Sequence, residues 1–260
     1  MKLYFKSVVL LVKSQGQHKE SFIMMIVTQF IQPFALFAGI YFLLERFGSI
    51  KGYSPFEVFL CYAVVGMCFS AATCFARGFD VFAGMIRAGT FDRVLVRPRS
   101  TILQVLASNF DIKRIGHFFQ SAIVLVVALI KSDITWSLAR FIILLNMIVG
   151  GTVIFAAVYL IEATAAFWTT EALEVANIFT HGMKEHASYP LDIFPKWITV
   201  FFTFIIPFGT VNYIPLQYLL GRTTFNPLVV VFIPILGCLF ILPCIAFWSY
   251  GVRRYTSTGS

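Results

Sequence analysis

The chain has 260 residues, of which 59% are hydrophobic and 12% are charged. Soluble proteins carry about 25% charged residues, so this composition excludes an ordinary soluble domain and indicates an integral membrane protein. The formal net charge of +8 does not indicate nucleic-acid binding, because Lys and Arg are confined to short segments beside apolar runs, where they orient a chain in the membrane.

Residues 1–20 are too short and too often interrupted by polar residues to cross a bilayer. On a helix, Lys2, Lys6 and Lys13 fall on one side and the apolar residues occupy the others. We expect a helix that lies in the membrane interface, with its lysines toward lipid phosphates or a partner. An ordinary solvated lead-in is the alternative.

Six apolar segments follow, and we expect each to cross the bilayer as a helix, for which about 20 apolar residues are needed. Pro207, Asn212 and Pro215 disfavour one straight helix through the fifth apolar run. We therefore expect the fifth span to end near Phe208, followed by a short broken or re-entrant piece on the far side. The fold class predicted is all-α integral membrane, with a single transmembrane domain over residues 1–260. The predicted spans are 21–44, 55–76, 115–130, 141–167, 197–208 and 228–250.

The distribution of Lys and Arg predicts the orientation. With six spans, both termini lie on one side, together with the long polar loop 77–114 and a second polar segment, 169–196. Fifteen Lys and Arg residues fall on that side. Five fall on the other: Arg46, Lys51, Lys131, Arg140 and Arg222. The positive-inside bias therefore places both termini and both polar segments in the cytoplasm.

Several polar residues lie in or beside the predicted spans, where such groups need partners inside the bundle. For Glu162, a carboxylate facing the bundle is favoured over a proton relay. His181, Glu185 and His186 read H-x-x-x-E-H, one residue too long for the H-x-x-E-H zinc spacing, so no metal site is expected. The candidates for a pathway or a helix interface are Gln29, Gln32, Asn146, Glu162 and Asn212.

The loop 77–114 holds seven Lys and Arg residues and three Asp residues, so it must lie in water. In its MIRAGTFDRVLVRPRS stretch, Thr90 can cap a helix that Pro98 ends. Phe91 and Leu95, four residues apart, would form an apolar plug on one face of that helix. An apolar plug ringed by arginines suits a groove on an acidic-rimmed partner. The alternative is that the arginines only hold phospholipid headgroups and fix the topology. The surrounding arginines are Arg87, Arg93, Arg97 and Arg99.

The chain contains no G-x-x-x-x-G-K-[ST] phosphate loop, so we do not expect it to hydrolyse nucleotide. Any work done with ATP must then come from another polypeptide.

The same stretch resembles the first cytoplasmic loop of ABC-2 type transporter permeases, in which a short coupling helix carries a pattern like E-x-G-T-L-E-x-L-L-x-x-P. Arg87 stands near a position where many of these permeases have an acid. SYPLDIFPKW (188–197) and FIIPFGTVNYIPLQYLLGR (204–222) are similar to segments of the six-span bacterial members. The residues that match the loop pattern are Gly89, Thr90, Phe91, Asp92, Leu95 and Pro98.

The resemblance implies a permease subunit of an exporter in the bacterial cytoplasmic membrane, paired with a second copy or a paralogous permease and surrounded by membrane lipids. A separate ABC ATP-binding subunit would supply ATP and Mg, and this chain would bind no cofactor and catalyse no reaction. The implied cargo is a drug, natural product, peptide or lipid-like molecule. The residues that would couple to the ATPase are Arg87, Gly89, Thr90, Phe91, Asp92, Arg93, Leu95, Arg97 and Pro98.

Two other functions remain open from the residues alone. An intramembrane lipid-modifying enzyme would need convergent ionisable groups, whereas His117, Glu162 and His181 are scattered along the sequence. The second alternative is a membrane assembly factor that transports nothing.

Overall fold

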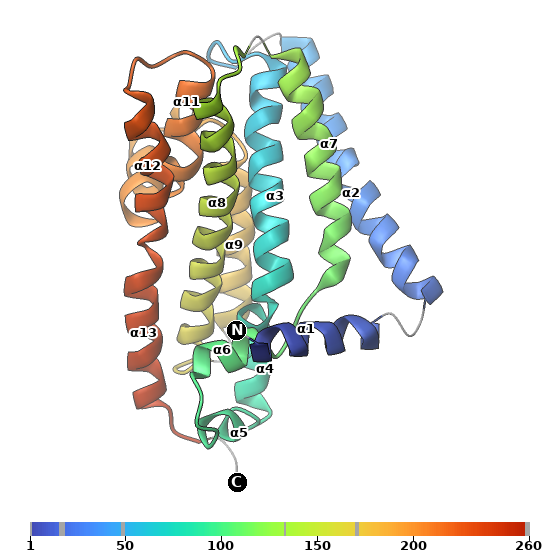
Figure 1. Cartoon of the computed structure of the whole chain (residues 1–260), viewed down its shortest axis with the longest axis vertical. Helices are drawn as coiled ribbons and strands as arrows, with labels where there is room; N and C mark the ends of the chain where they lie inside the picture. The colour runs from blue at the N-terminus through green and yellow to red at the C-terminus, as the bar shows by residue number, and fades with distance from the viewer. Residues whose placement is uncertain (1, 16–18, 48–49, 133, 170–171, 258–260) are drawn as a thin grey trace.

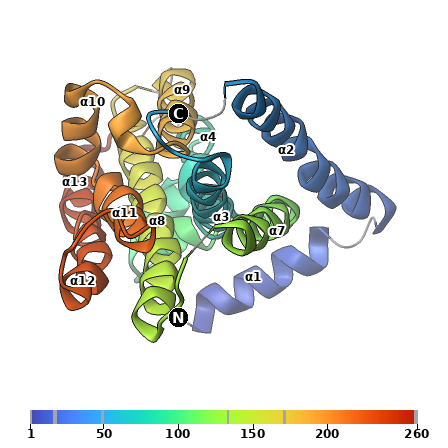
Figure 2. The same cartoon turned by 90° about the horizontal axis from the view of Figure 1, so that it is seen from above.

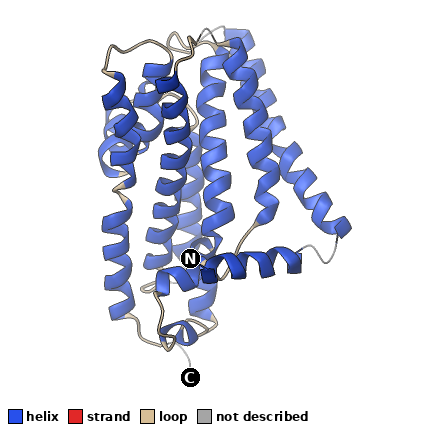
Figure 3. Ribbon diagram, in the orientation of Figure 1, coloured by secondary structure: helices blue, strands red, loops and turns tan. Residues whose placement is uncertain are grey.

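The computed structural model describes residues 2–15, 19–47, 50–132, 134–169 and 172–257. Within these ranges the chain is a bundle of helices joined by loops and contains no strand (Figures 1 and 3). Five helical segments are long and apolar enough to cross a membrane, and a sixth is added if one bent helix pair is counted as a span. The predicted all-α membrane fold is confirmed.

Helix α3 (Pro55–Asp80) is the centre of the bundle. Its residues 58–70 are all buried, because α7 (Ile115–Lys131) and α8 (Leu138–Ala165) pack along it. A helix covered by neighbours needs no polar face, which explains its nearly uncharged sequence. The segment 50–57 lies at one end of α3 and the loop 77–114 lies at the other; these are called the 50–57 end and the 77–114 end below.

The remaining long helices surround this centre. α2 (Lys19–Phe47) packs on α7, and α12 (Pro227–Cys238) and α13 (Ile241–Arg254) pack on α8. α1 (Lys2–Gln15) lies across the bundle near the 77–114 end, as an interfacial helix would (Figure 1). Its Tyr4 hydroxyl donates to the Phe75 carbonyl at 3.1 Å. Residues 1 and 16–18 of the predicted interfacial helix lie outside the described residues.

The predicted fifth span, 197–208, does not cross the bundle. Helical segments Lys196–Ile205 and Gly209–Leu219 meet at 93° around Pro207, which lacks the N–H that would continue the helix. Both flanks return to the 50–57 end: Lys51 Nζ donates to the Asp192 carbonyl, and Arg222 Nη2 to the Gly52 carbonyl, each at 2.8 Å. The pair is therefore re-entrant. It comprises α10 (Lys196–Val200), η3 (Phe201–Ile205), η4 (Gly209–Tyr213) and α11 (Ile214–Leu219).

The fifth crossing is instead α9 (Ala172–Ala187), so the prediction that 169–196 is a loop at the 77–114 end is wrong. α9 packs against α3 and α8, and the Ala187 carbonyl accepts from Asn212 Nδ2 at 2.9 Å, deep in the bundle. Along its described side chains, Met183 and Ala187 are buried, whereas His181 is exposed. α9 is therefore a packed helix that keeps polar side chains such as His181 and Glu185 exposed.

Replacing 197–208 by α9 keeps six crossings and leaves both termini at the 77–114 end. Thirteen Lys and Arg residues remain in the termini and the loop at that end, and Lys184 lies within α9. Six lie at the other end, so the charge bias keeps its direction. Those six are Arg46, Lys51, Lys131, Arg140, Lys196 and Arg222.

Candidate functional site

The 77–114 end projects beyond the rest of the bundle (Figure 1). α3 kinks at Ala76, where φ is −106° and ψ 17°, and continues through α4 (Phe82–Arg87). Gly89 then reverses the chain with φ +62°, a conformation that glycine adopts at little cost. α5 (Asp92–Leu95) and α6 (Thr101–Leu106) lead back toward α7.

Phe91 lies inside this end, with none of its surface exposed. Its ring centroid lies 5.1 Å from that of Phe82, 5.4 Å from that of Phe167 and 5.1 Å from that of Tyr255. The prediction that Phe91 and Leu95 form a shared exposed plug is therefore wrong for Phe91. Aromatic rings that follow α8 and α13 in the chain cover it, and spacing along the loop does not reveal them.

Thr90 does not cap α5 as predicted. Its hydroxyl donates to the Met85 carbonyl at 3.1 Å and closes the preceding turn, and α5 begins after Phe91 without a side-chain cap. Asp92 accepts a hydrogen bond of 2.6 Å from the Ser257 hydroxyl. The C-terminal segment therefore packs on the same short helix.

The outermost surface is residues 93–99, called the tip. Val96 is 82% exposed and Leu95 39% exposed, a large apolar area on a polar loop. Pro98 is exposed as well, and the tip contains no acidic residue. The sequence pattern does not single out Val96, because it places the apolar plug at Phe91 and Leu95. Three exposed arginines surround the two aliphatic side chains: Arg93, Arg97 and Arg99.

The tip is fixed to the bundle by specific contacts. Gln104 Nε2 donates to the Val94 carbonyl at 3.1 Å and to the Arg99 carbonyl at 3.0 Å. Gly78 lies so close to α6 that a Cβ there would stand 1.9 Å from the Val105 carbonyl oxygen. A displacement of the tip would therefore be transmitted to α3.

A second polar region, called the polar cleft, lies among α2, α3, α7 and α9; Figure 2 shows α2 and α9 on either side of α3. It consists of two hollows of about 380 and 460 Å³ that share Phe69, Arg114 and His181. Gln29 and Gln32 line the first, as expected of polar residues that need partners within the bundle.

The Lys and Arg side chains that line the first hollow are Arg114 and Lys184, and no Asp or Glu among the described residues lines it. Arg114 Nη1 donates to Gln29 Oε1 at 3.4 Å, and Lys184 Nζ lies 5.3 Å from the centroid of the Phe69 ring. His117 Nε2 is buried without a hydrogen-bond partner among the described residues. In the second hollow, Arg77 forms an ion pair with Asp80. The sequence alone does not indicate this cluster, because the polar composition of residues 169–196 predicts a loop around Lys184, and His117 and His181 lie far apart in the chain.

The other three predicted polar residues lie elsewhere. Asn146 Nδ2 donates to the Val231 carbonyl at 3.0 Å and joins α8 to α12. Asn212 Nδ2 donates to Cys61 Sγ at 2.9 Å, as well as to α9. Glu162 lies near the end of α8, with Oε1 buried and unpaired among the described residues. The structure therefore gives Asn146 and Asn212 structural roles and does not bring Glu162 into the cleft lining.

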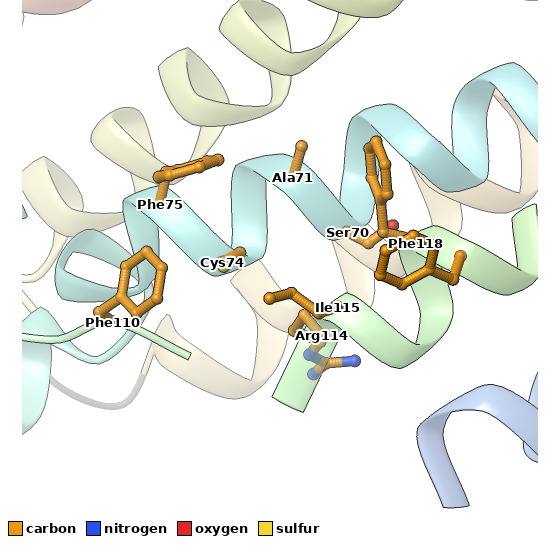
Figure 4. Close-up of a pocket in the computed structure, with 9 residues that line it drawn as sticks. Ser70, Ala71, Cys74, Phe75, Phe110, Arg114, Ile115 and Phe118 are labelled. Atoms are coloured by element: carbon orange, nitrogen blue, oxygen red, sulfur yellow. The ribbon is translucent and has the colours of Figure 1, made fainter. Parts of the chain in front are cut away.

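A third hollow, of about 300 Å³, is almost wholly apolar and lies beside the start of α7 (Figure 4). Phe75, Phe110 and Phe118 line it, and Arg114 stands at its edge. Because Phe75 and Phe119 are more than half exposed, it opens on the outer surface of the bundle. Among the described residues, no group of three or more His, Cys, Asp or Glu side chains is arranged to hold a metal ion.

A sequence profile described as ABC-2 family transporter protein matches residues 30–259. The chain belongs to this family. The matched range of this ABC-2 family chain includes the tip, the re-entrant pair and all of the polar-cleft lining except Gln29, and the resemblance predicted from the loop is confirmed. As a family member with several apolar crossing helices, it is a multi-pass membrane permease subunit and not a nucleotide-binding domain. Searches among curated proteins and among solved structures give no match.

Proposed function

We propose that this chain is the transmembrane subunit of an ATP-driven exporter and that a separate ATP-binding subunit docks on the tip. The observation that carries the proposal is the exposure of Val96 and Leu95 among three arginines, on a loop attached to the core of the bundle. An apolar patch that is buried on binding, with polar and charged groups at its rim, is the usual anatomy of a protein–protein interface. The partner would supply ATP and Mg²⁺.

The contacts behind the tip suggest how motion would be transmitted. The Phe91 ring joins α5 to the end of α8 and to Tyr255 after α13. Packed aromatic rings resist deformation and move as a unit. Closure of two ATP-binding subunits would thus shift the tip and tilt α3, α8 and α13 together, as rigid bodies.

We also propose that two permeases, identical or paralogous, pack together in the bacterial cytoplasmic membrane with their termini in the cytoplasm. The polar cleft holds exposed polar groups, including Gln32 and His181, on helices that cross the membrane. Such groups are costly against lipid and are normally covered by protein or water. A second permease over this face would enclose a polar pathway for cargo.

Copurification tests the docking proposal. Tagged chain would be coexpressed with the ATP-binding subunit encoded beside it, and the ratio of the two proteins measured after purification. Val96→Asp should abolish copurification while leaving the yield of membrane-inserted chain unchanged, because Val96 is 82% exposed. Phe225→Asp is the matched control, since Phe225 is 57% exposed after the re-entrant pair, at the 50–57 end. Normal copurification of the Val96→Asp chain would reject the tip as the docking surface.

A further inference from the structure

Two cations, Arg114 and Lys184, line one hollow of the polar cleft. Arg114 enters from the start of α7 and Lys184 from α9. Each has an acid nearby: Asp111 Oδ2 lies 3.7 Å from Arg114 Nε, and Glu185 Oε1 lies 3.4 Å from Lys184 Nζ. Neither acid lines the hollow, and no acidic side chain is among the described residues that do. The lining itself therefore holds two cations and no acid, and the acid beside each cation lies outside the hollow.

An aromatic and apolar wall faces these cations. The Phe69 ring centroid lies 5.3 Å from Lys184 Nζ and 5.6 Å from the His181 ring centroid. Pro33 and Tyr62 continue the wall away from the 77–114 end. A cationic site next to an apolar wall matches a ligand that has one charged end and one apolar end.

The second hollow connects this site toward the 77–114 end. Its own acid, Asp80, is held by Arg77 and therefore does not leave an uncompensated negative charge beside Arg114. Thr73 and Tyr159 provide hydroxyl groups along it. A molecule entering from the cytoplasmic leaflet would meet Arg114 with its head group and Phe69 with its tail.

We infer that the polar cleft binds an anionic amphiphile, with its phosphate or carboxylate against Arg114 and Lys184 and its alkyl chain along Phe69. The guanidinium group suits this role, because its planar fork of donors matches the oxygens of a carboxylate or phosphate. The inference rests on the proposed export function and names the chemical class of its cargo.

Head-group selectivity tests this inference on the full chain. Purified protein in a non-ionic detergent would be offered equimolar phosphatidylglycerol and phosphatidylcholine with the same acyl chains, and bound lipid measured by native mass spectrometry. We expect one saturable site that prefers the anionic lipid about tenfold, the effect of roughly one charge-assisted hydrogen bond. Equal binding of the two lipids would overturn the inference, and this comparison needs no variant.

Charge removal provides the second test. Arg114→Gln and Lys184→Gln should each weaken binding of the anionic lipid about tenfold, and Arg114→Lys should restore part of it. Lys131→Gln is the control, because Lys131 is an exposed cation at the other end of α7. Folded Gln variants that keep full selectivity would also overturn the inference.

A competition arm separates a transported amphiphile from a resident lipid. n-Dodecyl phosphate should displace phosphatidylglycerol from the site, whereas zwitterionic n-dodecylphosphocholine should not. Retention of the lipid against dodecyl phosphate would assign the same anionic site to a membrane lipid and overturn its assignment to cargo. None of these measurements involves the ATP-binding subunit, so their failure is distinct from failure of docking at the tip.

Discussion

The indole Nε1 of Trp248 donates a 3.0 Å hydrogen bond to Oγ1 of Thr101. Trp248 belongs to α13, and Thr101 begins α6, directly after the tip. The same indole ring packs 4.9 Å from Phe82 and 5.2 Å from Phe167, measured between centroids. The last crossing helix is therefore connected to the proposed docking loop by both a polar contact and an aromatic cluster.

Truncating the Trp248 side chain should destabilise the 77–114 end. Trp248 is 1% exposed, so Trp248→Ala should cost about 3–5 kcal/mol through lost packing, and Trp248→Phe about 1 kcal/mol through the lost hydrogen bond. Thermal unfolding of the purified chain measures both. Leu242→Ala, at a 57% exposed position on α13, is the control; equal melting of Trp248→Ala and this control would contradict the packing role.

Phe91 and Leu95 should behave differently although both lie in the loop pattern. Phe91→Ala removes a fully buried ring and should cost about 3–5 kcal/mol, whereas Leu95→Ala should change stability little and weaken docking. The yield of monodisperse protein and the copurified ATP-binding subunit report the two effects. Normal stability of Phe91→Ala, with lost docking, would instead favour the exposed plug predicted from the sequence.

The difference at Phe91 shows what a local pattern can and cannot predict. The loop spacing correctly indicates a short helix between Gly89 and Pro98, because it depends on neighbouring residues. Burial of Phe91 depends on Phe167 and Tyr255, which lie far away in the sequence. Only Leu95 of the predicted pair stays partly exposed, beside Val96.

The bundle shows the same limit. Five of the six crossings were predictable from apolar runs, since such runs have few alternatives in a membrane. The sequence does not predict α9 as a crossing helix, because Lys184 and Glu185 lower its average hydrophobicity. Burial of Met183 and Ala187 is visible only in the structure. Pro207 correctly indicated a break, but only contacts such as Arg222 with Gly52 reveal that the chain turns back.

Cysteine labelling tests this corrected topology. A membrane-impermeant maleimide applied to intact cells should label Lys196→Cys, which precedes the re-entrant pair at the 50–57 end, and should not label Arg97→Cys at the tip. Both positions are exposed, so accessibility within the protein is matched. Labelling of Lys196→Cys only after permeabilisation would restore the loop predicted for 169–196.

Close packing of α3 on α6 leads to a further prediction. Gly78→Ala should destabilise the chain by about 1–3 kcal/mol, because its Cβ would stand 1.9 Å from the Val105 carbonyl oxygen and a backbone atom would have to move. Gly84→Ala, also helical but with nothing within 4 Å, should be neutral or stabilising by up to about 1 kcal/mol. Thermal unfolding compares the two variants. Equal destabilisation would show that loss of glycine, and not the close contact, is responsible.

The 50–57 end should be insensitive to moderately alkaline pH. The Tyr53 hydroxyl donates to Asp192 Oδ2 at 2.7 Å, and burial, reinforced by this hydrogen bond, raises the pKa of Tyr53 above its ordinary value of 10.0. A group whose pKa is higher in the folded state than in the unfolded state contributes its full stabilisation at pH values below the unfolded-state pKa. That stabilisation is lost as the pH rises through the folded-state pKa. Tyr53→Phe should therefore cost about 1–3 kcal/mol equally at pH 7 and pH 9, measured by thermal unfolding. If the destabilisation caused by Tyr53→Phe were smaller at pH 9 than at pH 7, the Tyr53 hydroxyl would not be the protonated donor described here.

This chain is proposed to turn the motion of a separate ATP-binding subunit into movement of its own helices. ATP hydrolysis by the purified components tests this proposal most directly. Reconstituted alone in proteoliposomes, the chain should hydrolyse no ATP; with the ATP-binding subunit, hydrolysis should appear and should vanish when the phosphate-loop lysine of that subunit is replaced. Hydrolysis by the chain alone, or hydrolysis that survives that replacement, would contradict the account.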